Sequence, residues 1–231
     1  MTDLSDLRVR VCKANLDLVA HGLVLCTWGN VSGIARETGR VVIKPSGIAY
    51  SALTPDCMVV TDLDGRVLEG DLRPSSDLDT HLEIYRAFGG VGGVAHTHSR
   101  AATSFAQAKR ALPCYGTTHA DHFYGTIPVT RDMSAAETSV AYEANTGLVL
   151  VEAIGDRDPL EISAVLVASH GPFTWGDTPE TAVINSVVLE AVAEMALQTL
   201  SLAPVPPIGQ HLLDRHFLRK HGATAYYGQV H

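Results

Sequence analysis

The sequence predicts an α/β protein in which helices cover a sheet with antiparallel parts, and three observations support this class. Helical and strand-like segments alternate irregularly along the 231 residues. Hairpin turns at residues 37–40 and at Asp64-Gly65 join short apolar strands. A long helical segment follows the last strand-like segment. Because hairpins join antiparallel neighbours, these features disfavour a doubly wound parallel sheet.

The first half of the chain begins with an amphipathic helix. Apolar residues recur at three- and four-residue spacing from Leu4 to Leu18, and the helix is expected to end near Gly22. Strands are expected at residues 23–27, 31–35, 41–43, 59–61 and 66–68, and a helix at 77–88.

The second half of the chain continues the alternation. A glycine-rich turn at 89–93 leads into a strand that carries histidines. The remaining expected elements are a helix at 100–108, a loop at 113–132, a segment at 137–151 that fits either helix or strand, a strand at 163–170, a helix from Asp177 or Thr178 to about Leu200, and a last helix at 210–220. Without an internal repeat or linker, residues 1–231 are expected to form one domain.

Composition excludes several classes of protein. Hydrophobic residues make up 46% and charged residues 18%, which is typical of a globular core and not of disorder. The net charge of -8 argues against a nucleic-acid partner. The 4 cysteines show no CxxC spacing, so neither a thiolate zinc site nor a redox motif is expected. An acidic N-terminal stretch and the lack of an apolar run of about 20 residues predict a cytoplasmic protein with no membrane partner.

The sequence His96-Thr97-His98 is the most informative motif. In an extended strand, alternate side chains share a face, so His96 and His98 would project together. His170 again ends an apolar strand-like segment. Three imidazoles leave room for a carboxylate and an open position, which is typical of a catalytic metal site. The alternative is a set of half-buried histidines with ordinary hydrogen-bond partners.

Two further segments carry groups suited to a phosphate. Residues 44–47, Lys-Pro-Ser-Gly, offer an ammonium, a hydroxyl and backbone N–H groups. Residues 74–77 add two hydroxyls at a helix start, where the helix dipole also favours an anion. An ordinary turn and an ordinary helix cap are the plainer interpretations. The candidate phosphate ligands are Asn30, Lys44, Ser46, Gly47, Ser75 and Ser76.

Several more titratable residues have two interpretations. Asp77 is either a helix N-cap or a fourth metal ligand. His119 and Asp121 lie in a polar loop and are candidates for acid/base work. In the tail, Tyr226 and Tyr227 would either pack on a core or partner, or supply a phenol as a general acid.

Taken together, these segments resemble the class II sugar-phosphate aldolase/epimerase family. The resemblance runs from about residue 5 to the C-terminus. Its motifs are TWGNVS (27–32), IKPSG (43–47), PSSD (74–77), HTHSR (96–100), GTTHADHFYGTIP (116–128), SHGPFTWG (169–176) and LLDRHFLRKHGATAYYGQ (212–229).

The resemblance implies a fold, an assembly and a site. The fold would be a three-layer α/β/α subunit with a mixed, largely antiparallel sheet, in a homotetramer with active sites at subunit interfaces. A divalent metal, usually zinc, would be held by Asp77, His96, His98 and His170. The substrate phosphate would bind among the six candidate phosphate ligands. The acid/base pair falls on the positions of Asp121 and Tyr227, with Thr117, Glu143 and His216 as further active-site positions.

The motifs are similar to those of the family's epimerases, which convert L-ribulose 5-phosphate into D-xylulose 5-phosphate at the fourth carbon. The reaction implied is retro-aldol cleavage and re-addition through a metal-bound enediolate. The resemblance leaves the pathway open, since arabinose and ascorbate breakdown both use this step. The nearest alternative is an aldolase of the same family, whose members typically carry Glu at the position of Asp77. A sugar-phosphate dehydratase with the same metal site, or a metal-binding protein without catalysis, would also account for the histidines.

Overall fold

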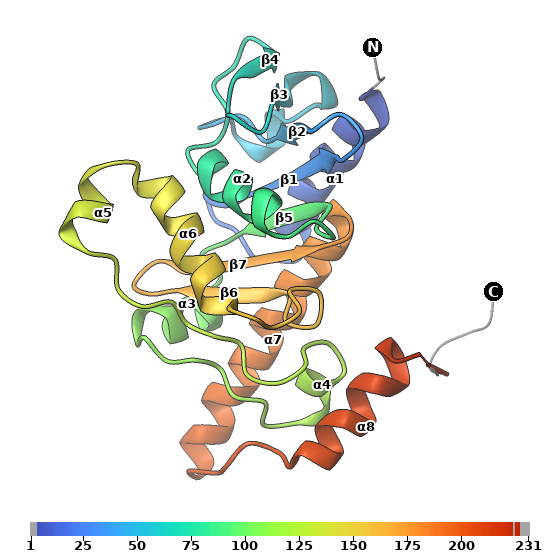
Figure 1. The fold of residues 1–231 in the computed structure, drawn as a ribbon, viewed down its shortest axis with the longest axis vertical. Coiled ribbons are helices and arrows are strands. Elements are labelled where there is room, and N and C mark those ends of the chain that lie inside the picture. Colours follow the sequence, from blue (N-terminus) through green and yellow to red (C-terminus); the bar gives the residue numbers. More distant parts are fainter. Residues whose placement is uncertain (1–3, 224, 227–231) are drawn as a thin grey trace.

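A seven-stranded antiparallel sheet forms the centre of the protein in a computed structural model that describes residues 4–223, 225 and 226 (Figure 1). The strand order is β4-β3-β2-β1-β5-β7-β6, and every pairing between these strands is antiparallel. The prediction of a largely antiparallel sheet is therefore confirmed. Parallel pairing is limited, among the described residues, to an isolated bridge between Val129 and Leu166.

Helices and strands alternate along the chain, which begins with a helix. The strands are β1 Asn30–Ala35, β2 Arg40–Ile43, β3 Val59–Thr61, β4 Val67–Glu69, β5 Gly93–His96, β6 Ala164–Val167 and β7 Gly171–Gly176. The α-helices are α1 Ser5–Ala20, α2 Leu78–Ala87, α3 Arg100–Gln107, α4 Thr117–Ala120, α5 Ala135–Ser139, α6 Tyr142–Ile154, α7 Pro179–Leu202 and α8 Gln210–His221.

Helices pack on both faces of the sheet, with α2 and α6 on one face and α1 and α7 on the other (Figure 1). The alternation of side chains along each strand decides which core a residue joins. In β5, Val94 belongs to the cluster that includes α2 and α6, whereas Ala95 belongs to the cluster around α1. In β2, Val41 and Ile43 join the first cluster and Val42 joins the second.

The core under α2 is aromatic. Trp175 of β7 is fully buried, and its ring lies 5.5 Å from that of Phe88. Its indole N–H donates a hydrogen bond of 2.7 Å to the carbonyl of Pro159, so the polar end of the side chain is satisfied. This packing anchors β7 beside β5, the strand that carries His96.

The helix α7 spans 24 residues and packs along β5 and β7. The hydroxyl of Thr178 accepts from the backbone N–H of Thr181, and Pro179 occupies the first turn, which confirms the predicted start. Length and composition alone would let this helix cross a membrane, contrary to the expectation from the sequence. This is weak evidence for a membrane span, because a helix that packs on a core sheet passes the same test.

Two segments differ from the secondary structure predicted from the sequence, and the structure resolves a third that the sequence left open between helix and strand. Residues 23–27 form no strand, because the backbone turns left-handed at Cys26, with φ of 53°. The ambiguous segment 137–151 divides into parts of α5 and α6. Residues 171–176 form the strand β7, which pairs with β5 and β6. Pairing with both neighbours is a tertiary contribution that no local pattern in Gly-Pro-Phe-Thr-Trp-Gly indicates.

We expect Gly93→Ala to lower the free energy of unfolding by roughly 1–3 kcal/mol, the usual cost of overpacking a core. An added Cβ at Gly93 would lie 2.4 Å from the backbone of Pro179, so the start of α7 would have to move. The matched control is Gly89→Ala, where an added Cβ meets nothing within 4 Å. Urea unfolding measures both variants, and equal stabilities would contradict this account of the α7–β5 contact.

Candidate metal and phosphate site

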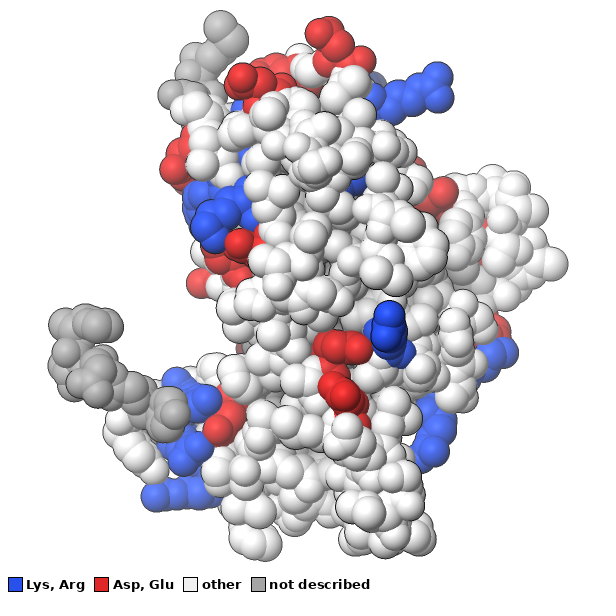
Figure 2. Space-filling view, turned by 180° about the vertical axis from the view of Figure 1, so that it is seen from behind, with Lys and Arg blue, Asp and Glu red and all other residues white. Residues whose placement is uncertain are grey.

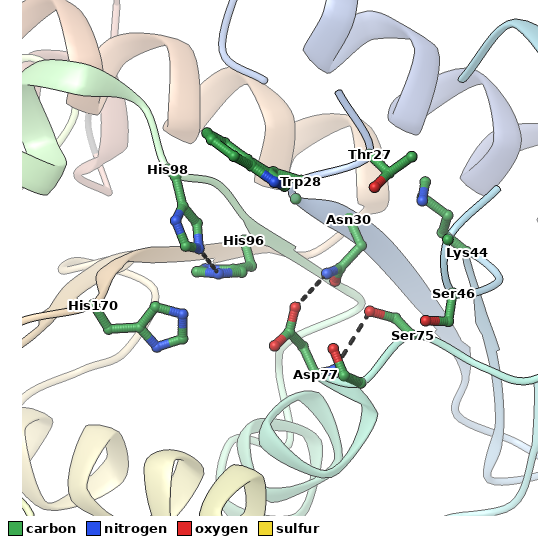
Figure 3. Close-up of a pocket in the computed structure, with 13 residues that line it drawn as sticks. Thr27, Trp28, Asn30, Lys44, Ser46, Ser75, Asp77, His96, His98 and His170 are labelled. Atoms are coloured by element: carbon green, nitrogen blue, oxygen red, sulfur yellow. Dashed lines mark hydrogen bonds between the residues drawn. The ribbon is translucent and has the colours of Figure 1, made fainter. Parts of the chain in front are cut away.

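A cavity of about 520 Å³ opens where β1, β2, β5 and the start of α2 meet, and Figure 3 shows its lining. Every metal ligand and every phosphate ligand expected from the sequence lines this one cavity. The lining residues are Thr27, Trp28, Gly29, Asn30, Lys44, Ser46, Gly47, Ser75, Ser76, Asp77, His96, His98 and His170.

Three histidines converge at one end of the cavity. The candidate ligand atoms of His96, His98 and His170 all lie within 4.8 Å of one another. The Nε2 atoms of His96 and His98 are 3.0 Å apart, and the ring of His170 lies 4.8 Å from that of His96. This separation suits nitrogens that share one divalent ion.

Hydrogen bonds and packing fix the ring of His96. Its Nδ1 lies 2.9 Å from the carbonyl of Pro172, which accepts only from a protonated nitrogen. The lone pair of a neutral His96 is therefore on Nε2, the atom that faces His98. The ring also stacks on Phe173, with 4.1 Å between centroids. The orientation of this ligand is thus set before any metal binds.

The three imidazoles are held in the neutral form that binds metals. Burial is the main cause that lowers the pKa of His96 to about 3, and it is also the main cause that lowers the pKa of His98 and of His170. The Nδ1 of His170 is buried without a hydrogen-bond partner. An orphaned nitrogen in a cluster of neutral imidazoles fits a divalent cation.

Asp77 lies in the same cavity, but its carboxylate is not part of the group of ligand atoms within 4.8 Å. Its Oδ2 accepts a hydrogen bond of 2.6 Å from the Nδ2 of Asn30. Burial alone would raise the pKa of Asp77, but His96, His81 and the Asn30 hydrogen bond outweigh it, so the pKa is lowered. Asp77 occupies the N-cap position of α2, where its backbone carbonyl accepts from the N–H of His81, but its side chain makes no capping hydrogen bond.

Two turns meet at the other end of the cavity. Pro45 and Pro74 form an antiparallel bridge, and this joins residues 44–47 to residues 74–77. The backbone N–H of Ser46 donates to Arg73, and that of Ser75 donates to Lys44. Because those two N–H groups are occupied, Ser46 and Ser75 would bind an anion through their hydroxyls, and Lys44 would bind it through its ammonium.

Lys44 supplies that ammonium from a buried position, with 2% of the residue exposed. Its Nζ lies 5.0 Å from the centre of the Tyr50 ring and 3.3 Å from the carbonyl of Pro45. Within the described part of the chain it forms no ion pair with a carboxylate. Burial lowers the pKa of Lys44, since the charged form is poorly solvated. A bound phosphate would supply the missing counter-charge.

A buried polar network supports α2 directly behind the site. The hydroxyl of Ser32 lies 2.7 Å from the Nδ1 of His81 and 2.8 Å from the hydroxyl of Tyr85. His81 lies one turn after Asp77, and burial lowers its pKa to about 4. This network ties β1 to the first turns of α2, the helix whose start carries Asp77.

Asp121 and His216 are brought together, but away from the metal cavity. Asp121 follows α4, and its carboxylate accepts from the Nδ1 of His216 at 3.0 Å and from Arg219 at 2.9 Å. Lys220 lies 3.5 Å away. Burial alone would raise the pKa of Asp121, but the hydrogen bonds from Arg219 and His216 lower it. In Figure 1, α4 and α8 lie at the end of the molecule opposite β4.

Acidic and basic side chains are sparse over much of the face seen in Figure 2, where white residues cover most of the surface. At the lower left of this face, blue Lys and Arg side chains lie beside a red acidic side chain. The last turn of α8 carries Arg219 and Lys220, both of which contact Asp121. The Asp121 cluster is therefore charged and locally basic, although the whole chain has a net charge of -8.

The remaining predicted active-site residues also lie outside the cavity lining. Thr117 begins α4, and Glu143 lies in the first turn of α6, where its backbone carbonyl accepts from the hydroxyl of Thr80. Its neighbour Tyr142 has its ring 6.4 Å from that of His170. Tyr227 lies outside the described residues.

Four residues of these clusters were not assigned a role from the sequence. Thr27, Trp28 and Gly29 line the cavity, and Arg219 holds Asp121 with three hydrogen bonds. The signal for the first three was their position directly before Asn30 in the same motif. No sequence signal singled out Arg219 among the basic residues in the last turn of α8.

The fold and the site together define a protein of the class II aldolase type. The family described as "Class II Aldolase and Adducin N-terminal domain" matches residues 9–197, and this chain belongs to it. Its members use a divalent metal, which the cluster of three histidines fits.

Solved structures show the same fold. An L-fuculose 1-phosphate aldolase matches with a TM-score of 0.80 at 24% identity, over 92% of this chain and 94% of that one. The L-fuculose-1-phosphate aldolase of Thermus thermophilus matches with a TM-score of 0.65 at 25% identity, over 87% of this chain and 100% of that one. YgbL of Escherichia coli matches with a TM-score of 0.72 at 21% identity, over 91% of this chain and 97% of that one.

We expect His96→Asn to lose most of its bound metal, because it removes the nitrogen with the most constrained orientation. Metal content after dialysis against a zinc buffer measures this. The control is His21→Asn, an exposed histidine outside the cavity. Full metal content in the His96 variant would contradict the ligand assignment.

We expect His119 to make folding sensitive to acid. Burial is the main cause that lowers its pKa from 6.5 to about 4. The unfolded chain therefore binds more protons between these values, and stability falls as the pH falls through this window. One such residue lowers the free energy of unfolding by about 2 kcal/mol at pH 5. Urea unfolding at pH 7 and pH 5 measures how much the free energy of unfolding decreases between these values. The decrease should be smaller for His119→Gln than for the wild type or for His21→Gln. Equal decreases would contradict the role of His119 in acid sensitivity.

Proposed function

We propose that this protein is an L-ribulose-5-phosphate 4-epimerase, a single class II aldolase/epimerase domain over residues 1–231. It would convert L-ribulose 5-phosphate into D-xylulose 5-phosphate with a divalent metal, Zn²⁺ in the first instance. The observation that carries the proposal is the shared cavity. A cluster of neutral histidines lies at one end and a buried, unpaired ammonium with serine hydroxyls lies at the other.

This arrangement fits a ketose phosphate bound along the cavity. The phosphate would be held by Asn30, Lys44, Ser46, Gly47, Ser75 and Ser76, all of which line the cavity. His96, His98 and His170 would hold the metal, together with Asp77. When bound, the metal would act as a Lewis acid that stabilises negative charge developing next to the carbonyl.

The fourth carbon carries no acidic proton, so inversion needs a carbon–carbon bond to break and form again. A base takes the proton from the C4 hydroxyl, the C3–C4 bond breaks, and its electron pair stays on the carbonyl-side fragment. Glycolaldehyde phosphate is the second fragment, and the phosphate ligands would retain it while it turns its opposite face to the attacking carbon. An acid on that side returns the proton to the new hydroxyl.

Asp121 and Tyr227 are proposed as this acid/base pair, with Thr117, Glu143 and His216 as further active-site positions. Since Asp121 and His216 do not line the cavity of their own chain, we propose that a neighbouring subunit supplies them. A homotetramer of three-layer α/β/α subunits with interfacial active sites would meet this requirement. The helices on both faces of the sheet support the layered arrangement.

An aldolase of the same family is the second candidate, and solved aldolases with this fold support it about equally. An aldolase would release both fragments instead of rejoining them. The family's aldolases typically carry Glu where this chain has Asp77, which favours the epimerase. A metal-binding protein without catalysis would leave the buried Lys44 and its hydroxyl partners unexplained.

The deciding experiment incubates the zinc-loaded protein with L-ribulose 5-phosphate. A coupled assay follows D-xylulose 5-phosphate, and free dihydroxyacetone and glycolaldehyde phosphate are measured in parallel. Xylulose phosphate without free fragments would support the epimerase. Free fragments would favour the aldolase, and bound metal without turnover of any ketose phosphate would favour a metal-binding protein.

The interfacial site predicts complementation between two inactive variants. His96→Asn removes a metal ligand, and Asp121→Asn removes a residue proposed to act in the neighbouring cavity. Mixed subunits that assemble at random would regain about a quarter of wild-type activity, because each cavity draws one contribution from each of two chains. Subunits are mixed under mild denaturant, refolded and assayed. Activity no higher than that of the separate variants would contradict the shared site.

A further inference from the structure

Trp28 is an exposed indole in a polar cavity. Among the thirteen residues that line the cavity it has the only large apolar side chain. About half of it, 54%, is exposed to solvent, and its ring lies 6.2 Å from that of His98. The second tryptophan of the chain, Trp175, is fully buried. Exposure of an indole is unfavourable in water, so its presentation at this cavity calls for an explanation.

The loop that carries Trp28 is held rigidly. The hydroxyl of Tyr50 donates to the carbonyls of Trp28 and Gly29, at 2.7 and 2.9 Å. Gly29 has φ of +79°, and a Cβ there would lie 2.8 Å from the carbonyl oxygen of His96. Cys26 is also left-handed, with φ of 53°. Backbone strain of this kind persists where the surrounding structure fixes the position of a functional residue.

The indole ring of Trp28 lies between the two ends of the cavity (Figure 3). Figure 3 shows Trp28 between His98 on one side and Lys44 on the other, across the cavity from Asp77. A ligand that joined the metal end to the phosphate end would therefore pass the indole. Its middle carbons would face the ring, while Asn30 and Asp77 would face its hydroxyl groups.

We propose that Trp28 is a substrate-binding residue, which packs its indole face against the C–H surface of the carbon chain of a bound ketose phosphate. The inference rests on the proposed function and adds the residue that recognises the apolar surface of the substrate. The polar lining binds hydroxyls and phosphate but offers no surface to C–H groups. The indole supplies that surface and excludes water from the bond that breaks.

Tryptophan fluorescence tests the contact separately from turnover. Acrylamide quenches an exposed indole far more than a buried one, so quenching of the wild-type protein reports mainly on Trp28. We expect saturating L-ribulose 5-phosphate, at equilibrium with its products on the zinc-loaded protein, to reduce that quenching severalfold. Inorganic phosphate, which reaches only the Lys44 end, should leave it nearly unchanged. Trp28→Phe retains only Trp175 and should show weak quenching with or without ligand.

Steady-state kinetics gives the second measurement. Trp28→Ala should raise KM about tenfold, which corresponds to roughly 1.4 kcal/mol of binding, with kcat much less affected. Trp28→Phe should recover most of the loss, because a phenyl ring still offers an apolar face. The matched control is Leu25→Ala, whose side chain is equally exposed, lies in the same loop and does not line the cavity.

The outcomes separate this inference from the proposed function. If the wild type turns over the substrate but quenching is insensitive to it and the KM of Trp28→Ala is unchanged, the inference is wrong and the function stands. If the wild type shows neither turnover nor ligand protection, the proposed function fails and the inference fails with it.

Discussion

The site depends on the register between β1 and β5. In this antiparallel pair Asn30 lies opposite His96, and β5 in turn places His96 opposite Phe173 of β7. The first pairing brings Asn30, which binds Asp77, beside His96, and the second places Phe173 where its ring stacks on that of His96. A slip of one residue would send His96 to the face covered by α1 and α7. Hydrophobic side chains pack on both faces of the sheet and make such a slip costly.

The cavity contains neutral imidazoles together with two charged side chains, Asp77 and Lys44. Its histidines are kept neutral by burial, whereas Asp77 is kept ionised by its neighbours and Lys44 is a buried cation without a carboxylate partner among the described residues. Buried charged groups of this kind destabilise the free protein, because no ion pair offsets the free energy of their desolvation. A metal at the histidine end and a phosphate at the lysine end would each supply the missing interaction. The same unpaired groups that weaken the free protein therefore favour binding of the proposed ligands.

The separation between the metal cavity and the Asp121 cluster would give the proposed assembly a chemical role. Within one chain, the metal ligands, the phosphate ligands and Trp28 share a cavity, while Asp121 is held by α8 through Arg219 and His216. A subunit interface would bring the second set over the first. In the proposed assembly, the rigid loop around Trp28 would present a fixed apolar wall opposite the groups supplied by the neighbouring subunit.

The sequence by itself determined the residues of the site and most of the elements. Local patterns were sufficient for α1, α7, both hairpins and the pairing of His96 with His98, because helical and strand periodicities are local. The resemblance of the motifs predicted which distant residues share the cavity. Only the tertiary structure decided that residues 171–176 form a strand, that residues 23–27 turn back to present Trp28, and that Asp121 lies away from its own metal cavity. These features depend on strand partners, backbone strain and helix packing between residues far apart in the chain, and no local sequence pattern encodes such contacts.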